Sequence, residues 1–83
     1  MKTNKYMICD TNEGYYDLYL FEEEIDIAEL EQVIRNHKES CIDENRQAFW
    51  DYESIEKEIK KHYKVKDLIL LAKGENAKEI EDI

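Results

Sequence analysis

Cysteine and histidine are the residues of this sequence best suited to catalysis or metal binding, and there are only two of each. His37 and Cys41 stand four positions apart, a spacing that places two side chains on one face of a helix. An imidazole and a thiolate so placed are two of the four ligands that a structural zinc site needs. Only a coincidence of folding would bring Cys9, Asp43 or His62 to complete it. We therefore predict no metal site here, and interpret the pair as an interior cysteine beside a helix-terminal histidine.

Nucleophilic catalysis requires a nucleophile, a base within hydrogen-bond reach and an oxyanion donor. The pairs Cys9/His37 and Cys41/His62 supply the first two only if the fold brings them together. The sequence has just two glycines, and neither lies in a glycine-rich loop that opens a phosphate-binding helix. We predict a non-enzymatic protein without catalytic, cofactor-binding or metal-binding residues.

Negative charge is the strongest global feature of the chain, with 21 acidic and 12 basic residues and a net charge of −9. Residues 10–44 hold twelve acids and two bases, whereas residues 57–66 hold five lysines and one acid. This charge repels nucleic-acid backbones and anionic lipid, so we predict no direct nucleic-acid partner and no membrane. The chain also lacks a long apolar run, a secretory signal and a dense cysteine framework, which predicts a cytoplasmic location.

Two runs rich in strand-forming residues, 6–9 and 15–21, predict an antiparallel hairpin around the polar segment 10–14. In the second strand, alternation places two sets of side chains on opposite faces. One set is Tyr16, Leu18 and Leu20, and the other is Tyr15, Asp17, Tyr19 and Phe21. We predict that the leucine face packs on the core.

Two amphipathic helices are predicted after the hairpin. Asp26 followed by Glu29 is typical of a helix N-terminus, and apolar residues at helical spacing continue to about residue 40. The same spacing predicts a second helix from residue 43 or 45 to residue 63, with a break at Asp51 as an alternative.

A short apolar run at residues 65–72 predicts a last, central strand. The order ββααβ indicates a small two-layer α+β domain over residues 1–74, in which a three-stranded, largely antiparallel sheet carries two helices on one face. We predict a frayed helix or a disordered tail for residues 75–83.

The acidic half of the sequence suggests how the protein works. Closely spaced carboxylates imitate the phosphates of a nucleic-acid duplex and compete for a basic groove. In size and charge the chain resembles small DNA-mimic inhibitors, including anti-CRISPR and anti-restriction proteins, and immunity proteins that neutralise nuclease toxins. We hypothesise an acidic interaction protein that occludes a basic site on a nucleic-acid-processing protein such as a nuclease. The predicted partner-binding residues are Asp10, Glu13, Asp17, Glu22, Glu23, Glu24 and Asp26 for charge, and Tyr15 and Tyr19 for contact.

The alternative function is a self-associating structural or regulatory module. If the leucine face is buried, the aromatic face of the second strand is left either to pair two copies as a homodimer or to be covered by the second helix or the tail. A direct nucleic-acid binder that uses the lysines of residues 57–66 is a weaker option, because those lysines oppose the charge of the remaining chain.

Overall fold

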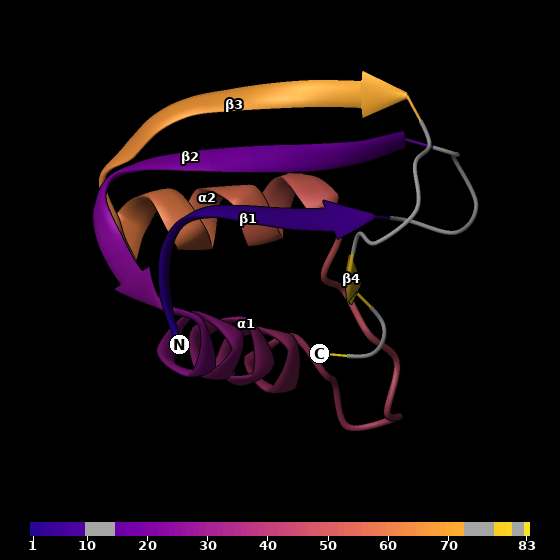
Figure 1. Ribbon diagram of the computed structural model, residues 1–83. Coiled ribbons are helices and arrows are strands. Elements are labelled where there is room, and N and C mark those ends of the chain that lie inside the picture. Colours follow the sequence, from indigo (N-terminus) through magenta and orange to yellow (C-terminus); the bar gives the residue numbers. More distant parts are fainter. Residues whose placement is uncertain (10–14, 73–77, 81–82) are drawn as a thin grey trace.

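A computed structural model describes residues 1–9, 15–72, 78–80 and 83, and shows a small α+β fold (Figure 1). The two helices and the α+β class confirm the prediction. The elements in chain order are β1 (Lys2–Cys9), β2 (Tyr15–Asp26), α1 (Ile27–Ser40), α2 (Tyr52–His62), β3 (Val65–Ala72) and β4 (Lys78–Glu79). The predicted order ββααβ is therefore correct as far as β3, and β4 follows it.

The sheet is mixed and has four strands in the order β3-β2-β1-β4. β2 pairs antiparallel with β1, which is the predicted hairpin, and it also pairs antiparallel with β3, whereas β4 pairs parallel with β1. β3 thus lies at an edge of the sheet and is not the central strand that its apolar run predicted. The segment predicted as a frayed helix or disordered tail contains β4, and Ile80 next to it is buried in the core.

The helices cover the opposite face of the sheet from the one predicted. Tyr19 and Phe21 are only 1% and 2% exposed, and they belong to the buried cluster that includes Leu30 of α1 and Ile55 of α2. Their rings lie 6.2 Å apart in a stacked arrangement. Large aromatic side chains bury more apolar area than leucine, so the aromatic face of β2 forms the core, and the leucine-face prediction is wrong.

α1 spans the predicted residues, and its start is fixed as expected by Asp26. The backbone N–H of Ala28 donates a hydrogen bond to Asp26 Oδ1 at 2.9 Å, which satisfies one of the unpaired donors at the helix N-terminus. Leu30 and Ile34 on the inner side of α1 are fully buried.

α2 begins at Tyr52, several residues later than the continuous helix predicted from residue 43 or 45. A reciprocal capping box starts it: Ser54 N donates to Asp51 Oδ1 at 2.8 Å, and Asp51 N donates to Ser54 Oγ at 3.0 Å. Before this cap, Ile42 and Ala48 form an isolated antiparallel bridge. Neither α1 nor α2, the helices of the described residues, has the length and apolar character to cross a membrane.

Candidate functional site

The largest group of predicted partner-binding residues lies where β2 leaves the regular sheet. Glu22, Glu23 and Glu24, which we call the acidic run, are all exposed. On one side of the run Lys5 pairs with Leu20, and on the other Thr3 pairs with Ile25, so β2 inserts extra residues between these two pairs. An insertion of this kind bends a strand and re-aims its side chains. It allows three consecutive carboxylates to face solvent where a regular strand turns every second residue inward.

Buried residues hold the acidic run at both ends. Phe21 before it is in the core, and Ile25 after it is 7% exposed. The backbone N–H of Glu22 donates to the carbonyl of Lys64 at 3.0 Å. The run is thus displayed on an anchored backbone, which lowers the entropy that a partner must remove on binding.

A recess beside the run is lined by residues of both signs of charge. Its acidic lining residues are Glu23, Glu24, Asp26 and Glu29, and its basic ones are Lys2, His62 and Lys64. The acids outnumber the lysines, and the carboxylates of the acidic run make no ion pair with another described residue. The end of the sheet where β2 passes into α1 is therefore acidic, with lysines at its border.

Among the other predicted contact residues that the structure describes, only Asp26 lies at this surface, where it lines the recess. Tyr19 is in the core and only 1% exposed, so its side chain does not lie on the surface that carries the acidic run. Asp17 lies on the same inner face of β2, and Asp26 is engaged as the cap of α1. Tyr15 begins β2, far from the acidic run at the other end of the strand. The remaining two predicted residues, Asp10 and Glu13, are outside the described residues.

Asp17 occupies an unusual place for a carboxylate. It pairs with Ile8 of β1 and Leu70 of β3 across the inner side of the sheet. Burial and the nearby carboxylate of Glu56 on α2 raise the pKa of Asp17 above its ordinary value. Burial, followed by Asp17 and Glu56, also raises the pKa of the Tyr19 hydroxyl. The carboxyl group of Asp17 thus lies at the margin of the core, in surroundings that disfavour its ionised form.

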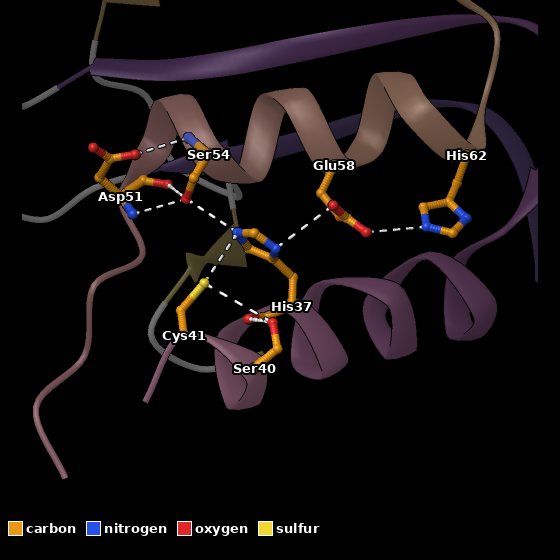
Figure 2. Close-up of polar contacts among 7 residues, drawn as sticks. All are labelled: His37, Ser40, Cys41, Asp51, Ser54, Glu58 and His62. Atoms are coloured by element: carbon orange, nitrogen blue, oxygen red, sulfur yellow. Dashed lines mark hydrogen bonds and ion pairs between the residues drawn. The ribbon is translucent and has the colours of Figure 1, made fainter. Parts of the chain in front are cut away.

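A second polar arrangement joins the two helices, and Figure 2 shows its members. His37 Nε2 lies 3.1 Å from Ser54 Oγ, and His37 Nδ1 lies 3.6 Å from Glu58 Oε2. Cys41 Sγ is 3.7 Å from the same Nε2 atom, and His62 Nε2 contacts Glu58 Oε1 at 3.0 Å. The i, i+4 pairing of His37 and Cys41 was expected from their spacing. The contribution of Ser54, 17 residues from His37, carried no signal in the sequence.

This serine–histidine–glutamate arrangement has the order of a catalytic triad, but its serine is committed to the backbone. Ser54 Oγ donates to Asp51 O at 2.9 Å and accepts from Asp51 N at 3.0 Å, and so completes the capping box of α2 (Figure 2). A nucleophile must instead give its proton to the base. We interpret the cluster as a link between α1 and α2. Among the described residues, no three histidines, cysteines or acids are grouped as they would be to hold a metal ion.

The lysines of residues 57–66 are partly neutralised within their own helix. Lys57 contacts Glu53 at 3.7 Å, and Lys60 contacts Glu56 at 3.7 Å. Both pairs have i, i+4 spacing, which favours such contacts along a helix. Both glutamates precede residue 57, so the charge of residues 57–66 alone makes this part of the folded chain look more basic than it is.

The chain matches no known protein-family model, no curated protein and no solved structure.

Proposed function

We propose that this protein is a non-enzymatic interaction protein that binds a basic surface through the acidic run Glu22–Glu24 and thereby blocks a nucleic-acid-processing protein, such as a nuclease. The observation that carries the proposal is the exposure of three consecutive carboxylates on a backbone anchored by Phe21 and Ile25. Such a surface attracts cationic grooves that otherwise hold phosphates.

Two further observations support an interaction protein over an enzyme. The best-formed polar cluster of the described residues uses its serine as a helix cap. The recess beside the acidic run is lined by carboxylates, lysines and His62, and none of its lining residues is a serine, threonine or cysteine. Neither arrangement offers the aligned nucleophile, base and oxyanion donor of covalent catalysis.

The direct test is affinity capture with the purified protein as bait in a bacterial lysate at low salt, followed by elution with a salt step. We expect a nucleic-acid-processing protein in the salt eluate, because exposed charges are screened once the Debye length falls below the width of the interface. Adding the bait to that protein should then inhibit its action on nucleic acid.

Two results would contradict the proposal. One is an eluate without a specific protein. The other is a captured protein that stays bound at high salt and keeps its full activity, since its contact would then be neither electrostatic nor inhibitory.

A further inference from the structure

The leucine side of the sheet carries an ordered apolar surface that no described helix or strand covers. Figure 1 shows both helices on one side of the sheet, and the residues of the other side are absent from the buried core cluster. We call this side the outer face. Its side chains come from three neighbouring strands and form three rows, in the order β1–β2–β3: Lys5–Leu20–Asp67, Met7–Leu18–Ile69 and Cys9–Tyr16–Leu71.

Two of the three rows contain no charge, and the third has a charge at each end. The seven uncharged side chains are all half-buried, whereas Lys5 and Asp67 are exposed. Strands lie about 4.8 Å apart, so Leu20 separates the ammonium and carboxylate groups by about 10 Å at the level of the backbone. Opposite charges thus stand on opposite borders of one apolar surface.

This distribution of charge is self-complementary. Two sheets that pack face to face align their strands to within about 30°. A two-fold axis along β2 places β1 of one copy over β3 of the other. Lys5 of each copy then faces Asp67 of its partner, and Leu18 and Leu20 meet their own counterparts on the axis.

The other two-fold axis in the plane of the interface runs across the strands. It places Lys5 over Cys9 and Asp67 over Leu71, so both charges are buried against uncharged side chains. Burying an unpaired charge is strongly unfavourable. The charge pattern therefore selects the axis along β2.

We propose that the outer face is a homodimer interface in which a second copy packs with its two-fold axis along β2 and pairs Lys5 with Asp67 in both directions. This inference does not depend on the acidic run or its partner. Three rows on three strands cover roughly 300 Å² of sheet, which is small for a stable complex. We therefore expect a dimer that dissociates in the micromolar range.

Charge reversal tests the pairing without removing apolar surface. Lys5→Asp and Asp67→Lys should each weaken dimerisation roughly tenfold or more, because each places like charges opposite each other. The double variant restores opposite charges and should dimerise like the original protein. The measurement is sedimentation velocity over a concentration series that spans the micromolar range, with circular dichroism to show that every variant is folded.

Leu70→Lys is the matched control. Leu70 lies on β3 but on the inner side of the sheet, where it is 68% exposed, so its replacement should leave dimerisation unchanged. If Leu70→Lys abolishes the dimer while the charge reversals do not, two copies pair through the edge of β3 and the proposal is wrong. A protein that stays monomeric throughout the series, or a double variant that is no better than the single ones, would also overturn it.

Discussion

At the scale of single residues, Tyr19 shows that the alternation of side chains along a strand reveals which residues share a face. The alternation does not reveal which face is buried. The sequence correctly separates Tyr19 from Leu18, because successive side chains of a strand point to opposite faces. Both faces of β2 carry apolar residues, however, so the pattern does not show which face the helices cover. Tyr19 belongs to a core cluster that includes residues of α1 and α2, and this cluster depends on packing between distant parts of the chain.

The inward orientation of Tyr19 predicts its effect on stability. Tyr19→Ala should lower the free energy of unfolding by about 3–5 kcal/mol, as for other buried aromatic residues. Tyr16→Ala, on the same strand and the opposite face, should cost clearly less, because Tyr16 is only half-buried. Urea denaturation of both variants measures the difference. Equal losses would contradict the assignment of the two faces.

Asp17 predicts a pH effect of definite sign. Its pKa is raised in the folded protein by burial and by Glu56, so the folded state binds this proton more tightly than the unfolded state. Stability therefore falls as the pH rises from the ordinary aspartate pKa through the raised one, and stays lower above it. Asp17→Asn removes this penalty.

We expect Asp17→Asn to be more stable than the original protein at neutral pH, and the gain to vanish at a pH below the ordinary aspartate pKa. Urea denaturation across this range measures it, with Glu24→Gln as a control for the removal of an exposed carboxylate. A gain that is independent of pH would show that the ionisation of Asp17 is not its cause.

At the scale of elements, local patterns in the sequence predicted the individual helices and strands well. They did not predict which distant segments pair with each other. The limits of α1 and β3 agree with the apolar spacing and with the cap at Asp26. The second helix was predicted too long, because Ala48 and Phe49 fit helical spacing, although Phe49 is 66% exposed and Ala48 bridges to Ile42. β4 has only two residues, and its parallel pairing with β1 joins the two ends of the chain, so no local pattern predicted it.

The cap at Asp51 explains why α2 begins where it does. Asp51→Ala should lower the free energy of unfolding by about 1 kcal/mol, because the backbone N–H of Ser54 loses its acceptor. Thermal or urea denaturation measures the loss. Glu53→Ala in the same turn is the control and should change stability by less than about 0.5 kcal/mol, since its pair with Lys57 is exposed. Equal effects would contradict the role of the capping box.

At the scale of the whole molecule, the sequence predicted an acidic protein but not where the fold would place its acids. The described acids of residues 15–44 do not form one surface: Asp17 faces inward near the start of β2, whereas the acidic run and Asp26, which caps α1, lie at its other end. The insertion in β2 that exposes the run has no marker in the sequence, because it arises from the pairing of Thr3 with Ile25. On the described residues we propose two surfaces for partners, the acidic run and the outer face.

We propose that the position of the acidic run, and not net charge alone, determines binding. The measurement that tests it most directly compares two variants of equal net charge as baits for the captured partner. One replaces Glu22, Glu23 and Glu24 with glutamine. The other makes the same replacement with glutamine at Glu39, Glu44 and Glu53, three exposed glutamates elsewhere on the molecule.

We predict that the first variant binds the partner at least roughly tenfold more weakly at low salt, and that the difference shrinks as salt is added. The second should bind nearly as well as the original protein. Equal affinities of the two variants would contradict the account, because binding would then follow total charge without regard to the place where the fold displays it.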